Sequence, residues 1–189
     1  MPPTRRTRRT LWLLRHAKTV TNPPPGGTDF DRRLAPRGRR DATALGHLLG
    51  PDATRLGLKK VRLPQVALVS PAARTAATAE LVLADLAEPP RSELVAGLYQ
   101  ADPDDVLDQL RGLDDDVTSV MVVGHNPTAH ALAQGLLADG DTHGRHLVQR
   151  RGFPTCALGV YGFALDHWSG LDGHQAHLDG LFTPPFEKS

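Results

Sequence analysis

Two arginines and two histidines stand out because each lies just beyond a short apolar run, where a strand of a parallel sheet would end. These residues are Arg15, His16, Arg74 and His125. Guanidinium groups bind phosphate oxygens through planar, paired N–H donors. A neutral imidazole can attack phosphorus, and nearby arginines disfavour its protonation near neutral pH. Together the four side chains are suited to phosphoryl transfer, with one histidine as a transient phosphate carrier.

The apolar runs before these residues have the pattern of buried strands. We predict strands over 11–14, 66–69 and 117–123, alternating with helices. This alternation favours a three-layer α/β/α sandwich with a mostly parallel sheet. In open α/β sheets, ligands bind beyond the carboxyl ends of the strands. Because three predicted strands deliver the four residues to that edge, we expect one shared pocket.

Helix signals follow the strands. Pro36 begins a helix that Gly50 can end, and Asp102 and Asn126 precede two further helix starts. Ser70 is predicted as the N-cap of the helix that contains Arg74. Helix N-termini favour anions, so an arginine in a first turn is best explained by an anionic ligand.

The last third of the chain has weaker signals. Residues 139–152 are predicted to form a polar loop. Residues 155–163 are rich in strand-forming types and are expected to pair at an edge with residues around Trp168. The single cysteine, Cys156, is interpreted as a small strand residue rather than a catalytic thiol.

Length and charge narrow the class of protein. A chain of 189 residues fits one compact domain, predicted over 10–189, behind a basic flexible tail over 1–9. The formal net charge of +1 gives no global field of the kind that marks a nucleic-acid binder. We therefore expect no nucleic-acid partner, and a solvated tail.

Targeting signals are weak. The basic start is followed by only four apolar residues, 11–14, whereas a secretion signal needs roughly 7–15. No window approaches the roughly 18 apolar residues of a membrane span. A lone cysteine excludes an internal disulfide and fits a reducing compartment. We expect a cytoplasmic protein without membrane contact.

Four motifs in order resemble the histidine phosphatase superfamily, also called phosphoglycerate-mutase-like. Its Arg-His-Gly hallmark is present as Arg15-His16-Ala17, with alanine as in the SixA-type phosphohistidine phosphatases. Residues 31–38 resemble the "RPLT–x–G" stretch, residues 70–78 the "SP–x–x–RT–x–x–T" motif, and residues 123–127 the "VGHNP" motif. The resemblance extends over about residues 11–170, and it implies the phosphoglycerate-mutase-like fold.

The resemblance also implies roles for individual residues. By position, His16 would be the nucleophile, Arg15 and Arg74 phosphate clamps, and His125 a second phosphate ligand. Substrate contacts would come from Lys18, Thr19, Asn22, Arg32 and Asn126. No metal and no cofactor is implied.

One part of the family pattern is missing. Many members carry an acidic proton donor between the second arginine and the second histidine, but residues 97–102 contain no well-placed glutamate, and SixA-like enzymes also lack it. General acid help is worth about 10²–10⁴ in rate, so substrates with good leaving groups are expected. Protein phosphohistidine, aryl phosphates and acyl phosphates meet this condition, and a short chain with an open site fits a protein surface as substrate.

Three alternatives stay open at this stage. The first is a phosphatase or mutase acting on a small metabolite such as a sugar, nucleotide or acyl phosphate. The second is a noncatalytic regulator that binds a phosphorylated ligand. The third is a metal enzyme using His143/His146 or His174/His177, but these pairs lack a metal-site motif and are interpreted as exposed loop histidines. The oligomeric state is not predicted.

Overall fold

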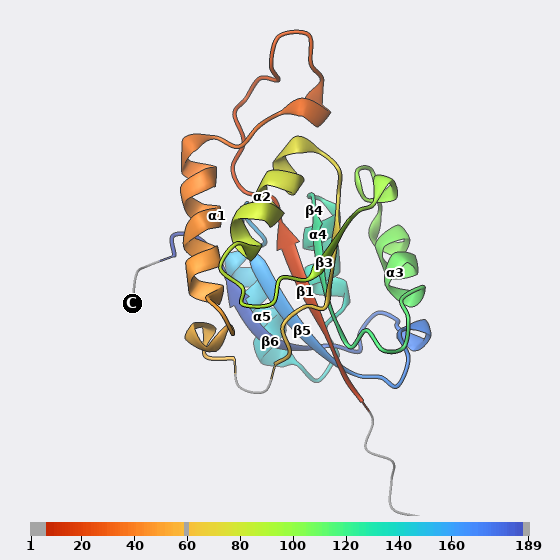
Figure 1. Ribbon diagram of the computed structural model, residues 1–189. Helices are drawn as coiled ribbons and strands as arrows, with labels where there is room; N and C mark the ends of the chain where they lie inside the picture. Colours follow the sequence, from red (N-terminus) through yellow and green to blue (C-terminus); the bar gives the residue numbers. More distant parts are fainter. Residues whose placement is uncertain (1–6, 59–60, 187–189) are drawn as a thin grey trace, which may run out of the picture.

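The computed structural model describes residues 7–58 and 61–186, and its centre is one six-stranded sheet (Figure 1). The strand order is β3-β2-β4-β1-β5-β6. Strands β1 to β4 are mutually parallel, while β5 is antiparallel to β1 and β6 is antiparallel to β5. The strands are β1 Arg8–Arg15, β2 Val66–Val69, β3 Arg91–Leu94, β4 Ser119–Gly124, β5 Leu158–Ala164 and β6 His177–Phe182.

Helices cover both faces of the sheet, so the predicted three-layer α/β/α sandwich with a mostly parallel sheet is confirmed. Helices α1 and α2 pack on one face, and α3, α4 and α5 on the other. Their bounds are α1 Pro36–Leu49, α2 Ala73–Leu83, α3 Pro103–Arg111, α4 Thr128–Gly135 and α5 Thr142–Arg151. None of the helices in residues 7–58 and 61–186 combines the length and the hydropathy that a membrane-spanning helix needs.

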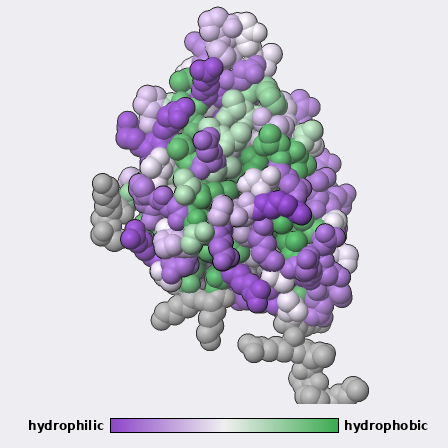
Figure 2. Space-filling model, viewed as in Figure 1, coloured by the Kyte–Doolittle hydropathy of each residue, from purple (hydrophilic) through white to green (hydrophobic). Residues whose placement is uncertain are grey.

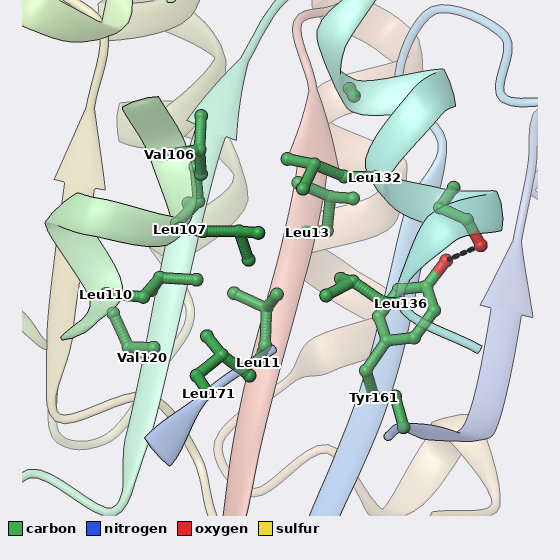
Figure 3. Close-up of a cluster of buried hydrophobic side chains, with 14 of the residues drawn as sticks. Leu11, Leu13, Val106, Leu107, Leu110, Val120, Leu132, Leu136, Tyr161 and Leu171 are labelled. Carbon is green, nitrogen blue, oxygen red and sulfur yellow. Dashed lines mark hydrogen bonds between the residues drawn. The ribbon is translucent and has the colours of Figure 1, made fainter. Parts of the chain in front are cut away.

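Strand β1 shows why the central strands are continuous apolar runs. Successive side chains of a strand point to opposite faces. Leu11 and Leu13 therefore pack beneath α3 and α4, whereas Trp12 and Leu14 pack beneath α1 and α2. Figure 3 shows the first of these clusters, in which the Tyr161 hydroxyl donates to the Ala133 carbonyl at 3.2 Å. A strand buried on both faces needs apolar residues at every position.

Strand β1 begins earlier than the sequence predicts. The boundary of the flexible tail at residue 9 is wrong for Arg8 and Arg9, which belong to β1; residues 1–6 lie outside the described part. Arg9 is only 1% exposed. Its guanidinium donates to the carbonyls of Val117 (2.7 Å), Asp115 (3.2 Å) and Asp166. A buried cation is tolerated here because backbone oxygens satisfy it.

These contacts predict that Arg9 stabilises the fold. Arg9→Ala should lower the free energy of unfolding by about 2–4 kcal/mol, because buried carbonyl groups lose their donors. Arg8→Ala is the matched control: Arg8 is half exposed and forms an ion pair with Asp179, so it should cost less than about 1 kcal/mol. Urea denaturation of both variants measures this difference. If both variants lost the same small amount of unfolding free energy, the buried contacts of Arg9 would not stabilise the fold.

Two predictions about the last third of the chain are wrong. Most of residues 139–152 forms α5, in which only Gly144 and Val148 are buried, so there is no apolar stripe to reveal the helix. His143 and His146 thus lie in a helix, and His177 lies in β6, not in loops. The edge partner of β5 is β6, not the segment around Trp168. Trp168 is buried in a short 3₁₀ helix, Trp168–Gly170.

Candidate active site

The carboxyl ends of β1, β2 and β4 meet at one edge of the sheet, and they bring the two histidines together. Arg15 is opposite Gly124 and Val69 is opposite Val123 in the strand register. The next residues of β1 and β4 are therefore neighbours: the His16 N–H donates to the Gly124 carbonyl (3.0 Å), and the rings of His16 and His125 are 5.4 Å apart between centroids. The structure thus joins the two predicted imidazoles in one site.

His16 is held in a defined tautomer. Its side chain is nearly buried, and Nδ1 lies 2.8 Å from the Ala17 carbonyl oxygen. A carbonyl oxygen only accepts, so Nδ1 carries the hydrogen and Nε2 keeps its lone pair. Burial and the charges of Arg74, Arg15 and Arg32 lower the pKa of His16 to about 4, although the bond to Ala17 acts in the opposite direction. The ring is therefore neutral at pH 7.

The backbone around His16 is fixed by close packing. The Ala17 N–H donates to Thr78 Oγ1 of α2 (3.0 Å), and the Cys156 N–H donates to the His16 carbonyl (3.0 Å). A side chain at Gly38, in the first turn of α1, would lie 2.0 Å from the Lys18 carbonyl oxygen. Glycine is required there because α1 begins directly against the loop that follows His16. Cys156 lies in the turn before β5, not in a strand as predicted.

Arg74 and His125 are joined by a hydrogen bond. Arg74 lies in the first turn of α2, is 6% exposed, and donates from Nε to His125 Nδ1 at 3.2 Å. Because Nδ1 accepts, Nε2 of the neutral ring carries the hydrogen and donates to Ser70 Oγ at 2.7 Å. Burial and the charge of Arg74 lower the pKa of His125 to about 3. In this arrangement both ring nitrogens have protein partners, and His125 orients the guanidinium.

Ser70 has a different place from the one predicted. Helix α2 begins at Ala73 with Ala72 as N-cap and no side-chain cap bond, so the N-cap prediction for Ser70 is wrong. The hydroxyl group bonds to His125 instead, and the Ser70 carbonyl accepts from Thr75 Oγ1 at 2.7 Å. The fully buried Ser70 thus connects the end of β2 to the end of β4.

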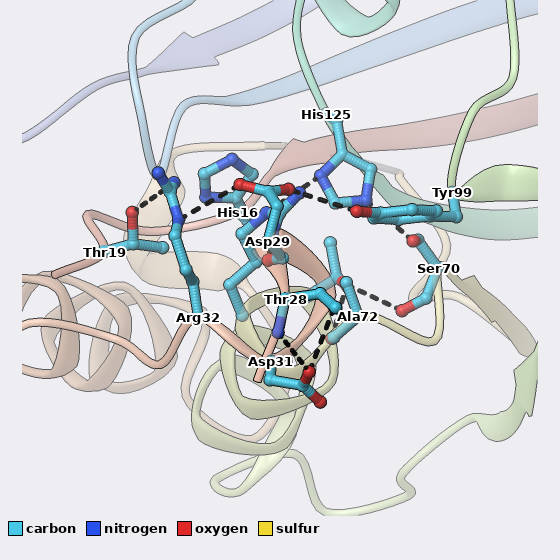
Figure 4. A network of polar contacts seen from close by, with 12 residues as sticks. His16, Thr19, Thr28, Asp29, Asp31, Arg32, Ser70, Ala72, Tyr99 and His125 are labelled. Carbon is cyan, nitrogen blue, oxygen red and sulfur yellow. Dashed lines mark hydrogen bonds and ion pairs between the residues drawn. The ribbon is translucent and has the colours of Figure 1, made fainter. Parts of the chain in front are cut away.

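The other side of the Arg74 guanidinium is occupied by Asp29, a residue that no motif in the sequence indicates. Arg74 Nη1 donates to the Asp29 carbonyl (2.6 Å) and Nη2 to Asp29 Oδ2 (3.0 Å). Arg32 Nε lies 3.3 Å from Asp29 Oδ1, and the Tyr99 hydroxyl donates to Oδ2 at 3.1 Å (Figure 4). Slight burial raises the pKa of Asp29, but Arg74, Tyr99 and Arg32 outweigh it and lower the pKa below the usual value.

Arg15 and Asn126 share one anchor. Arg15 Nη1 (2.9 Å) and Asn126 Nδ2 (3.2 Å) both donate to the Phe153 carbonyl, just after α5. Arg15 Nε and Asn126 Oδ1 are buried and lack a partner within the described residues. Arg15 is close enough to lower the pKa values of both histidines. The segment after α5 therefore fixes the second cation of the site.

The remaining predicted substrate contacts divide into two groups. Arg32 Nη2 donates to Thr19 Oγ1 at 2.8 Å, so both residues belong to the network around Asp29. Lys18 and Asn22 are exposed, and within residues 7–58 and 61–186 their side chains form no hydrogen bond or ion pair with this network. Over the same residues there is no group of three or more histidine, cysteine, aspartate or glutamate side chains arranged to hold a metal ion.

The geometry defines an α/β protein with a buried imidazole and several arginines at the carboxyl edge of its sheet, and comparisons with known proteins agree. The family model "Histidine phosphatase superfamily (branch 1)" matches residues 11–95. An uncharacterized protein of Mycobacterium tuberculosis is 34% identical over 173 residues, covering 90% of this chain and 99% of that protein. One from Mycobacterium leprae is 30% identical with the same coverage.

Solved structures give the same result. The candidate phosphohistidine phosphatase SixA from Nakamurella multipartitia is 29% identical, covers 96% of this chain and 99% of its own, and has a TM-score of 0.74. Its counterpart from Agrobacterium tumefaciens is 27% identical, with 93% and 98% coverage and a TM-score of 0.73. The chain belongs to the histidine phosphatase superfamily. It is a SixA-like phosphohydrolase with the phosphoglycerate-mutase-like fold, which confirms the resemblance found in the sequence.

Proposed function

We propose that this chain hydrolyses phosphohistidine in proteins, in two steps that pass through a phosphohistidine at its own His16. The observation that carries the proposal is the state of His16: Nδ1–H is bound to the Ala17 carbonyl, Nε2 is unprotonated, and Arg74 and Arg15 lie close enough to lower its pKa. Such a nitrogen is a ready nucleophile toward an anion held by guanidinium groups.

In the first step, His16 Nε2 attacks phosphorus and the bond to the leaving group breaks. The phosphorylated ring is cationic, and the Ala17 carbonyl stabilises it by accepting from Nδ1–H. Arg74 has five N–H groups, of which three are used by His125 and Asp29, so two are left for phosphoryl oxygens. Arg15 supplies the second positive charge. His125 keeps Arg74 in place between these partners.

In the second step, water attacks phosphorus on the side from which the first leaving group departed. The P–Nε2 bond breaks, its electron pair returns to His16, and both protons of the water end on the released phosphate. The fixed arginines stabilise the same charges as in the first step, so they need not move between the first step and the second.

The charge of Asp29 limits the substrates. A general acid must be protonated at the working pH, but the arginines lower the pKa of this carboxyl group, so it is ionised at pH 7. Substrates whose leaving groups need no proton from the enzyme are therefore favoured, and phosphohistidine is one of them. We also propose that the reaction takes place in the cytoplasm, because a single cysteine, Cys156, fits a reducing compartment.

A substrate panel with and without EDTA tests this function. We expect kcat/KM for phosphohistidine protein to exceed that for sugar and nucleotide phosphates by about 10²-fold or more, because alkoxide leaving groups receive no general acid help. Chelation should have no effect, since the arginines supply the positive charge. Preference for a sugar or nucleotide phosphate would instead identify a metabolite phosphatase, and binding of phosphate without any turnover would identify a regulator.

A further inference from the structure

We propose that Asp29 selects substrates in which the phosphoryl group is bound to a protonated nitrogen heterocycle. This inference rests on the proposed function, and it assigns a specificity-determining role to a residue outside the set predicted from the family motifs. Its basis is a carboxylate that Arg74 and Arg32 hold on the exposed side of the site, from which we infer that the leaving group departs.

The exposure of Asp29 and the loop that carries it show on which side of the site its carboxylate lies. Asp29 begins a short 3₁₀ helix, Asp29–Asp31, in the loop that projects beyond the sheet edge at the top of Figure 1. Its side chain is 56% exposed, whereas His16 is 8% exposed. The carboxylate is thus much more open to solvent than the nucleophile, and Figure 4 shows it between the His16 and His125 rings. In-line transfer places the leaving group opposite the nucleophile, which is also the solvent side.

The carboxylate is held by two guanidinium groups and one hydroxyl group. Arg74 binds its Oδ2, Arg32 lies beside its Oδ1, and Tyr99 donates to Oδ2. The ring of Tyr99 also packs edge-on against Phe30, with centroids 5.0 Å apart, next to Asp29 in the chain. A carboxylate has about four lone-pair positions, so these contacts leave it able to accept another N–H. The projecting segment at the top of Figure 2 is mostly white to pale purple, so it is not strongly hydrophobic.

An N-phosphorylated imidazole needs such an acceptor. Its ring leaves readily when the other nitrogen carries a proton. The bond from His16 Nε2 to phosphorus forms, the P–N bond of the substrate breaks, and its electron pair neutralises the imidazolium. The proton stays on the departing ring, so no acid is consumed. Asp29 would accept from this N–H as the Ala17 carbonyl accepts from His16 Nδ1–H.

The same charge acts against other leaving groups. An aryl oxide or a carboxylate leaves with growing negative charge, and a fixed anion on that side repels it. The two classes of substrate should therefore respond in opposite directions when the charge of Asp29 is removed. A residue that only holds Arg74 in place would affect both classes in the same direction.

The test compares Asp29→Asn with the wild-type chain on two small substrates, phosphoimidazole and p-nitrophenyl phosphate. Asparagine has nearly the same shape, and the backbone carbonyl at position 29 still accepts from Arg74. We expect kcat/KM to fall at least about tenfold for phosphoimidazole, because a charged hydrogen bond is lost. It should rise about two- to tenfold for p-nitrophenyl phosphate, because the repulsion is removed.

Asp31→Asn is the matched control, since Asp31 lies in the same turn but bonds to Thr28 and not to Arg74. The ratio of the two kcat/KM values should stay within about twofold of wild type in this variant. An equal fall for both substrates in Asp29→Asn, no change for either, or the same ratio shift in Asp31→Asn would overturn the selection role. If the wild-type chain turned over neither substrate, the proposed function would fail, and this inference with it.

Discussion

Replacement of His16 by alanine should abolish turnover, with a fall in kcat of about 10⁴-fold or more on any substrate of the chain. The physical reason is that no other imidazole in the site is free to attack phosphorus. Both nitrogens of His125 are occupied, by Arg74 and Ser70. Steady-state hydrolysis of phosphoimidazole measures the effect.

The control for this variant is His47→Ala. His47 lies in α1, is exposed and forms a hydrogen bond with Asp85 away from the site, so its loss should change kcat less than about twofold. Circular dichroism and a thermal melt of His16→Ala should show an intact fold, because the change removes a small part of a site at the sheet edge. Substantial activity in a folded His16→Ala protein would refute the two-step mechanism.

Replacement of Arg74 by alanine should lower kcat/KM by about 10²–10³-fold and weaken inhibition by vanadate to a similar extent. Vanadate resembles pentacoordinate phosphorus, so it reports the same charge stabilisation without chemistry. Arg74→Lys should recover only part of the loss, because an ammonium group lacks the planar fork that contacts His125 and Asp29 together.

Arg91→Ala provides the comparison for a general loss of positive charge. Arg91 is exposed at the edge strand β3, where it pairs with Glu93, and its removal should leave vanadate inhibition within about twofold of wild type. If Arg74→Ala keeps its fold and its inhibition by vanadate, the guanidinium does not contact the phosphoryl group.

The fold and the convergence of four side chains could be predicted because both follow from strongly apolar strands. Strands β1, β2 and β4 are buried on both faces, so their sequences are unmistakable runs, and parallel strands must end at the same edge. The residues that follow them, His16 and His125, are then neighbours whatever the details of the helices.

The parts that could not be predicted depend on tertiary contacts without a local pattern. Asp29 enters the site from a loop of proline and glycine residues, and only its pairing with Arg74 and Arg32 reveals it. Tyr99 contributes a hydroxyl group from residues 97–102, where the sequence pattern indicates only that the family's glutamate is missing. Helix α5 buries too few side chains to show a helical period. The first two residues of β1 are arginines, which do not resemble the start of a buried strand.

Trapping the phosphoryl group on the enzyme tests the mechanism most directly. The chain is mixed with ³²P-labelled phosphoimidazole, and the reaction is quenched in alkali within one turnover. The protein is then digested, and the labelled peptide is sequenced by mass spectrometry. We expect one label, lost in acid and retained in base, on the imidazole of residue 16. Turnover with no trapped label, or a label on any other residue, would contradict it.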